Sequence, residues 1–214
     1  MSAPARPRPT ALQRVHGALR RVPTWTVYLL AMMPAILYAV LAFTDRLGAD
    51  PARALEHGLG LWGLRLLLLG LAITPIRQLS GLNLVRFRRV IGLAAFTTVA
   101  LHLISWAWLD VGFEPATMWN DITRRPYITI GMAAFVLLIP LAVTSTNAMI
   151  RRLGPKTWNR LHKAVYLIAI LGGLHFLLLK KTIQPEPLVY LGIAVVLVGW
   201  RLVPQRRAGA AARA

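Results

Sequence analysis

The chain has 214 residues, of which 57% are apolar and 15% are charged, and its mean hydropathy is +0.57. A soluble domain carries about 25% charged residues, so this composition excludes an ordinary water-soluble fold. The net charge of +18 would suggest a nucleic-acid partner in a soluble protein, but here the basic residues lie between apolar runs, and we expect no nucleic-acid binding. Cysteine is absent, which excludes disulfides, thiolate zinc sites, iron–sulfur clusters and covalently attached c-type haem.

Residues 1–24 are predicted to form a basic tail that is rich in proline and arginine. Such a composition cannot bury a core, so we expect disorder up to about Ala11. The pair Arg20 and Arg21 before an apolar run resembles a twin-arginine signal. That run is long enough to cross a membrane and has no small-residue cleavage site at its end, which favours an uncleaved helix.

Six apolar runs follow, each near the roughly 20 residues that an α-helix needs to cross a bilayer. The predicted spans are Trp25–Phe43, His57–Ile76, Val90–Leu109, Tyr127–Thr146, Ala164–Leu179 and Pro187–Val203. Together they make one domain, residues 25–203, and a second basic tail occupies residues 204–214. The predicted fold is therefore all-α, a bundle of six transmembrane helices whose neighbours run antiparallel.

Charge alternates between the connections of this bundle. The amino tail, the 77–89 loop, the 147–163 loop and the carboxyl tail hold five, four, five and four basic residues and no acidic residue. The seven acidic residues all lie in the three other connections, and we expect none inside a span. The positive-inside rule then predicts that both termini are cytoplasmic. The lack of buried carboxylates also disfavours a pump or a cation transporter.

The ionisable residues at membrane depth are expected to be Arg65, His102 and His175, with His57 and His162 near the edges. His102 and His175 lie at similar distances from the outer ends of spans three and five. Two neutral imidazoles that face each other at one depth are what axial ligation of a b-type haem requires. Either histidine alone is more often a satisfied core or interface residue, but the matched depth favours a haem site.

A second haem on the inner side is less well supported by the residues. His162 lies thirteen residues before His175, or about 20 Å along a helix. The facing helix would need a histidine thirteen or fourteen residues before His102, where the chain has Arg89 and Arg88. Arginine is a poor ligand because its guanidinium stays protonated. The alternative for His162 is a residue at a helix start that bonds loop carbonyls or lipid headgroups.

Arg65 is predicted near the depth of His102 and His175. A guanidinium matches carboxylate geometry, so we expect Arg65 to hold haem propionates; the alternative is an arginine that snorkels to the outer interface. His57 and His16 are expected to be ordinary interface and tail residues. The cationic 147–163 loop would suit a flavin phosphate or a quinone headgroup, unless its charges only set topology.

Three segments resemble a known family: RFRRVIGLAAFTTVALHLISW, RRPYITIGM and LAVTSTNAMIRRLGPKTWNRLHKAVYLIAILGGLHF. They resemble the bacterial YedZ/MsrQ family, whose members are small relatives of the ferric reductase and NADPH oxidase transmembrane domain. The resemblance covers about residues 55–200. It implies a ferric reductase-like fold in the bacterial inner membrane.

The resemblance also implies a function. The family provides the haem-binding membrane subunit of the MsrPQ protein-methionine-sulfoxide reductase system. It passes electrons from the quinone pool or a cytoplasmic flavin reductase to the periplasmic molybdopterin subunit MsrP, which repairs oxidised methionine in periplasmic proteins. The chain would then be an electron-transfer subunit with no catalytic residues of its own.

The cofactors that the resemblance implies are haem b and FMN, which would make the chain an iron-containing flavoprotein. The haem histidines of the family match His102, His162 and His175 of this chain. Arg88 takes the position of an arginine that has been considered for the inner haem site. The larger oxidases have a fourth histidine and a fused nicotinamide- and FAD-binding domain; neither is expected here, so the number of haems is one or two. The alternatives are a stand-alone transmembrane ferric or quinone reductase and a non-redox scaffold or transporter subunit.

Overall fold

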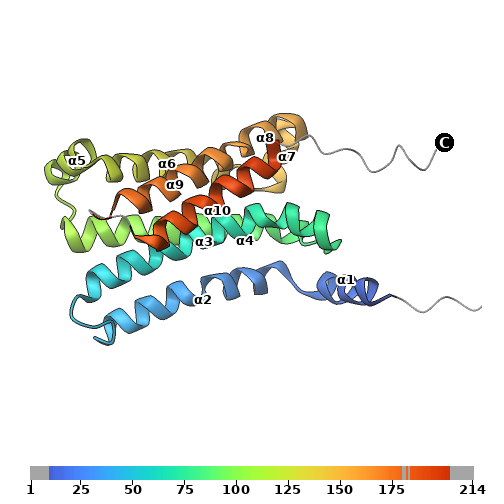
Figure 1. Cartoon of the computed structure of the whole chain (residues 1–214), viewed down its shortest axis with the longest axis horizontal. Coiled ribbons are helices and arrows are strands. Elements are labelled where there is room, and N and C mark those ends of the chain that lie inside the picture. Colours follow the sequence, from blue (N-terminus) through green and yellow to red (C-terminus); the bar gives the residue numbers. More distant parts are fainter. Residues whose placement is uncertain (1–9, 180–181, 183, 203–214) are drawn as a thin grey trace, which may run out of the picture.

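The computed structural model describes residues 10–179, 182 and 184–202, and their regular structure is entirely helical (Figure 1). The long helices are α2 (Thr24–Phe43), α3 (Pro51–Ser80), α4 (Arg88–Ser105), α6 (Pro126–Val143), α9 (Ala164–Leu178) and α10 (Pro185–Leu202). Shorter helices are α1 (Ala11–Arg21), α5 (Pro115–Arg124), α7 (Asn147–Leu153) and α8 (Pro155–His162). A 3₁₀ turn at Val85–Phe87 precedes α4, and a π-helical turn at Trp106–Asp110 follows it. The predicted all-α class is confirmed.

Five segments of the described part are long and apolar enough to cross a membrane: Thr24–Phe43, Pro51–Ser80, Val85–Asp110, Pro126–Val143 and Pro155–Leu178. They overlap the first five predicted spans, which confirms a multi-pass membrane protein. The sixth predicted span falls on α10, although Val203 and the carboxyl tail lie outside the described residues. A count of six spans and the cytoplasmic termini stay predictions.

Several expected connections contain helices. The cationic 147–163 loop is α7 and α8, separated by Gly154 at a positive φ of 75°. The tail becomes helical at Ala11, because Thr10 and Gln13 form a reciprocal capping box. These segments were not predicted as helices because they are rich in charge, and an amphipathic surface helix needs no continuous apolar run. Residues 1–9, where disorder was expected, lie outside the described part.

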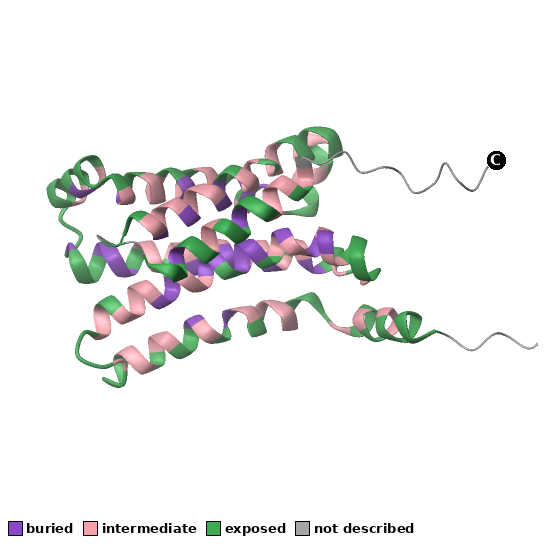
Figure 2. Ribbon diagram, in the orientation of Figure 1, coloured by how far each residue is buried: buried purple, intermediate pink, exposed green. Residues whose placement is uncertain are grey.

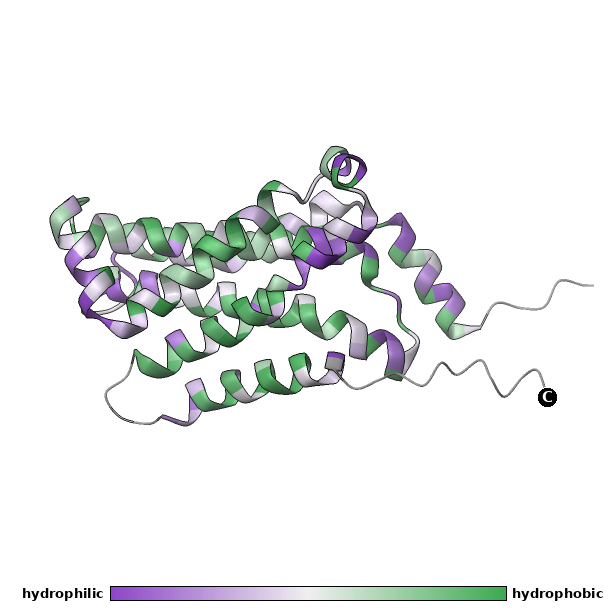
Figure 3. Cartoon of the chain, turned by 90° about the horizontal axis from the view of Figure 1, so that it is seen from above, coloured by the Kyte–Doolittle hydropathy of each residue, from purple (hydrophilic) through white to green (hydrophobic). Residues whose placement is uncertain are grey.

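The centre of the bundle is α3, which packs against α2, α4, α9 and α10, while α6 packs against α9. Buried residues gather where α3 and α4 meet, and the outer faces of the long helices are exposed (Figure 2). Those outer faces are apolar, as Figure 3 shows by hydropathy, whereas hydrophilic residues gather towards the ends of the bundle. This is the distribution of a protein surrounded by lipid.

The two ends of the bundle differ in charge. The basic elements α1, α7 and α8 lie at one end, and α5 with the acidic α2–α3 connection lies at the other (Figure 1). The segregation predicted from the sequence is therefore present in the fold. We call these the basic end and the acidic end.

Candidate functional site

His102 of α4 and His175 of α9 face each other inside the bundle, although they come from helices far apart in the sequence. Their ring centroids are 6.1 Å apart, and their planes are inclined by 71°. An ion held between two imidazoles by metal–nitrogen bonds of about 2 Å places the ring centres about 6 Å apart. The spacing of the two rings therefore fits one metal ion, such as a haem iron, between them.

Each ring is held by a backbone carbonyl of a neighbouring helix. His102 Nδ1 donates to the carbonyl oxygen of Glu56 in α3 at 2.9 Å, and His175 Nδ1 donates to that of Tyr127 in α6 at 2.7 Å. A carbonyl can only accept, so the proton of each neutral ring is on Nδ1. The lone pair is consequently on Nε2, which is the form of histidine that binds a metal.

A glycine follows each of these carbonyl residues by four positions, Gly60 after Glu56 and Gly131 after Tyr127. In a helix the carbonyl of residue i points towards residue i+4, so a side chain there would cover it. A Cβ atom at Gly131 would lie 2.6 Å from His175 Nδ1, and one at Gly60 would lie 3.1 Å from His102 Nδ1. The missing side chains thus let each imidazole reach its carbonyl.

This carbonyl-and-glycine arrangement occurs twice, once in the α3–α4 pair and once in the α6–α9 pair. Sequence reasoning missed all four supporting residues. The signal that would have found them is a glycine at the depth of each histidine on the helix next to it.

His162, at the end of α8, has a different environment. Its Nδ1 lies 3.1 Å from the carbonyl oxygen of Trp158, and its Nε2 lies 3.2 Å from that of Leu141 and 3.4 Å from Ser145 Oγ. The ring also stacks on Trp158 at a centroid distance of 3.7 Å. Both nitrogens thus contact protein groups, and these belong to helices α8 and α6 and to Ser145.

The two arginines beside the expected inner site point to different partners. Arg88 donates to the Thr74 hydroxyl of α3, and Arg89 donates to Asn147 Oδ1 at 2.6 Å. Neither guanidinium contacts His162 by a hydrogen bond among the described residues.

Arg65 lies on a different face of α3 from the histidine pair. It comes nine residues after Glu56, or about two and a half helical turns, and so it faces α10. Its Nε donates to the Tyr190 hydroxyl at 2.7 Å, and one terminal nitrogen lies 4.0 Å from a Glu186 carboxylate oxygen. Its side chain is 42% exposed, and the structure does not bring it to His102 or His175.

Comparison with known proteins shows which family this chain belongs to. Residues 59–173 match the family described as ferric reductase like transmembrane component. A relative from Rhizobium meliloti is 47% identical over 92% of this chain and 89% of its own length. Relatives from Agrobacterium fabrum and Azospira oryzae are 48% and 43% identical, over 84% and 94% of this chain and 83% and 84% of their own lengths. All three are named as the haem-binding subunit MsrQ of protein-methionine-sulfoxide reductase.

This chain belongs to the MsrQ family. The resemblance predicted from three sequence segments is thereby confirmed. The part that matches the ferric reductase family includes Gly60, His102, Gly131 and His162, and it ends two residues before His175.

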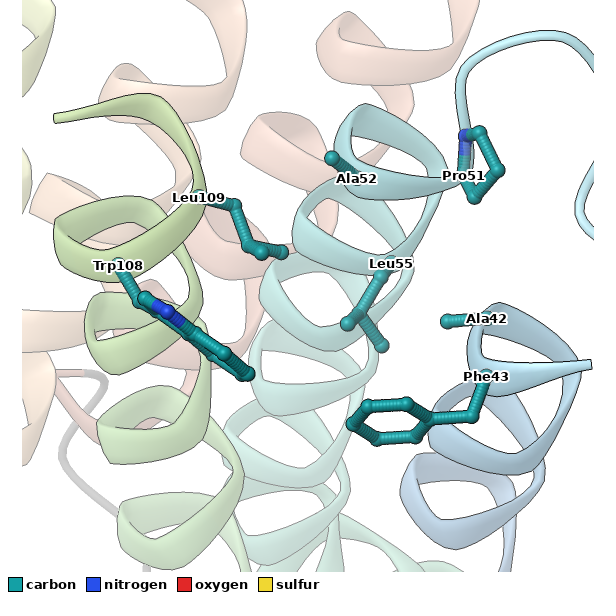
Figure 4. Close-up of a pocket in the computed structure, with 7 residues that line it drawn as sticks. All are labelled: Ala42, Phe43, Pro51, Ala52, Leu55, Trp108 and Leu109. Carbon is teal, nitrogen blue, oxygen red and sulfur yellow. The ribbon is translucent and has the colours of Figure 1, made fainter. Parts of the chain in front are cut away.

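A hollow at the acidic end of this MsrQ-family chain is separate from the histidine pair (Figure 4). It lies between the end of α2, the start of α3 and the π-helical turn. Its lining residues are all apolar: Ala42, Phe43, Pro51, Ala52, Leu55, Trp108 and Leu109. Its lining has no charged or hydroxyl-bearing side chain, so this hollow is a poorer candidate for the redox site than the histidine pair.

Proposed function

We propose that this chain is the haem-binding membrane subunit of a protein-methionine-sulfoxide reductase and that it carries electrons across the membrane. In this proposal one b-type haem is bound between His102 and His175. The observation that carries it is the pair of facing imidazoles, 6.1 Å apart, in which each Nδ1 is tied to a carbonyl and each Nε2 is left for a metal. The family supports the same function, because its members are named haem-binding subunits.

The residues of the site would prepare it for electron transfer. The carbonyls of Glu56 and Tyr127 fix the tautomer and orientation of both rings. Gly60 and Gly131 provide the space in which the rings lie. When bound, a haem supplies an iron that gains and loses one electron. The imidazole protons stay on Nδ1 throughout, so no proton needs to move at these two residues.

The direction of transfer follows from the proposed topology. Six spans, with α10 as the sixth and both termini in the cytoplasm, would place the basic end at the inner face of a bacterial inner membrane. His102 lies near the acidic end, eight residues before Asp110. The histidine pair would therefore be on the periplasmic side, where it can pass electrons out of the membrane.

The partner at the outer face would be the periplasmic molybdopterin subunit MsrP. Support comes from the outer connection, where Phe113 and Trp119 are 55% and 70% exposed beside the acidic Glu114. Exposed aromatic residues with charged neighbours are common in protein interfaces. Methionine sulfoxide would be reduced in the partner, and this chain would contribute no catalytic residue.

At the inner face the proposal includes an electron donor and a second haem. Electrons would arrive from quinones or a cytoplasmic flavin reductase, with FMN as a carrier. His162 and Arg88 are the residues that a second, inner haem would use, and Arg65 would hold a propionate of the outer haem only after leaving Tyr190. These roles rest on the family resemblance and on composition.

The test begins with a reduced-minus-oxidised spectrum of the full chain purified in detergent. A b-type Soret and α-band shift is expected, and a flat spectrum would refute the haem. Purified MsrP with methionine sulfoxide should then reoxidise the reduced haem. Reoxidation by ferric citrate or a quinone analogue but not by MsrP would favour a stand-alone ferric or quinone reductase instead.

A further inference from the structure

Two arginines near the basic end have buried nitrogens without an acceptor. They are Arg88 at the start of α4 and Arg201 in the last turn of α10. In the described part of the chain, their Nε atoms are the buried side-chain nitrogens that lack a hydrogen-bond partner. A buried N–H without an acceptor costs about 1–3 kcal/mol, so each of these atoms calls for an explanation.

Arg201 bonds to a carbonyl of α3 that has no hydrogen-bond donor within its own helix. Pro75 lies inside this helix and has no N–H, so the carbonyl of Leu71, four residues earlier, has no helical donor. Arg201 donates to that oxygen at 2.9 Å and reaches the Tyr166 hydroxyl of α9 at 3.5 Å. These contacts use its terminal nitrogens and leave Nε unused.

Arg88 approaches the same stretch of α3 from α4. It donates to the hydroxyl of Thr74, which lies three residues after Leu71 and therefore on the same side of the helix. Arg201 and Arg77 both lie close enough to act on the charge of Arg88. Two guanidinium groups thus converge on Leu71 and Thr74, and they repel each other.

Among the described residues, no carboxylate forms an ion pair with Arg88 or Arg201. The ion pairs among the described residues are Arg53–Asp50, Arg65–Glu186 and Arg125–Asp121, and all of them lie in or next to acidic connections. Two like charges inside a membrane domain are unfavourable without a counterion. If the two arginines only stabilised α3, their hydrogen bonds to Leu71 and Thr74 would be explained. Both Nε–H groups would still lack an acceptor, and both positive charges would still lack a counterion.

We propose that Arg88 and Arg201 bind a phosphate group between them, which is an alternative to the inner-haem role of Arg88. Two guanidiniums with Arg77 nearby suit the larger charge and the tetrahedral oxygens of a phosphate better than a planar carboxylate with one charge. The hydroxyls of Thr74 and Tyr166 accept bonds from the arginines and can each donate their own hydrogen to the same group. The site lies among α3, α4, α9 and α10, away from the histidine pair.

The phosphate can belong to a lipid headgroup or to a water-soluble compound, and the experiment separates these sources. The full chain is purified in a non-ionic detergent and phosphate-free buffer, and native mass spectra are recorded before and after adding inorganic phosphate or phosphatidylglycerol. The wild type should hold one more phosphate-bearing molecule per chain than Arg88→Gln or Arg201→Gln. Chloroform extraction then takes a phospholipid and leaves a soluble phosphate ester in water.

Arg89→Gln is the matched control, because Arg89 is the exposed neighbour that bonds to Asn147. It should retain the bound phosphate. Haem at the outer pair reports folding in every variant. If a glutamine variant loses its haem, the corresponding lysine variant, Arg88→Lys or Arg201→Lys, is measured instead. Lysine keeps the positive charge but lacks the Nε–H of arginine. These variants should bind phosphate at least about tenfold more weakly than the wild type. Equal binding in the wild type and the folded variants, with or without added phosphate, would overturn the proposal.

Discussion

The two ends of the bundle place their histidines in opposite ways. Near the acidic end, His102 and His175 each use one nitrogen for a backbone carbonyl and turn the rings towards each other. Near the basic end, His162 has protein groups at both nitrogens and a tryptophan against its face. In the proposed site, a histidine at membrane depth is prepared for a metal because a single carbonyl holds its Nδ1–H and no protein group donates to the lone pair of its Nε2.

The largest effect on the histidine pair is expected when a new side chain blocks the carbonyl that holds one of the rings. In Gly131→Ala the new methyl group would lie 2.6 Å from His175 Nδ1, well inside contact distance. The ring must move and lose its bond to Tyr127, and loss of such an outer partner typically weakens metal binding about 10–100-fold. Haem titration of the purified protein measures this affinity. Unchanged affinity would show that the Tyr127 carbonyl does not position His175.

Gly60→Ala should have a smaller effect on the other half of the site. Its methyl group would lie 3.1 Å from His102 Nδ1, so a shift of a few tenths of an ångström relieves the contact. We expect haem affinity to fall by about tenfold or less. Gly92→Ala is the control, because a Cβ atom there meets nothing within 4 Å; it should bind haem normally. An effect of Gly60→Ala larger than that of Gly131→Ala would contradict the geometry.

Replacing His162 sharpens the comparison at the other end. In His162→Ala the hydrogen bond that its single N–H donates to the carbonyl of Trp158 or Leu141 disappears together with the stacking on Trp158, which should lower stability by about 1–2 kcal/mol. Haem at the outer pair should remain, because His162 is not part of it. Thermal unfolding and haem content of the same sample give both results. A fall in haem content by one per chain would instead identify His162 as a ligand of a second haem.

The smallest effect is expected at Arg65. Tyr190→Phe removes the hydroxyl that accepts its hydrogen bond, and the half-exposed ion pair with Glu186 is worth at most about 1 kcal/mol. Stability should therefore fall only slightly. If Arg65 holds a haem propionate, Arg65→Gln will shift the haem midpoint potential while Tyr190→Phe will not. Equal potentials in wild type and Arg65→Gln would remove Arg65 from the site.

The sequence was enough to predict the long helices and the facing of His102 and His175, because both follow from counting residues along apolar runs. It was not enough to predict Glu56, Gly60, Tyr127 and Gly131, since their role depends on which helices are neighbours and how they are rotated. The expected span began at His57, yet α3 begins at Pro51, so Glu56 lies inside a helix that was expected to contain no acid. The partner of Arg65 could not be predicted for a similar reason: Tyr190 is 125 residues away in the chain.

The most direct test of the account is the haem content of His102→Ala and His175→Ala, measured as pyridine haemochrome per chain beside the wild type and His162→Ala. The account predicts that each of the two outer variants loses the same single haem, because one iron needs both rings, while His162→Ala keeps it. Full haem content with an unchanged low-spin spectrum in both outer variants would contradict the pairing of His102 with His175.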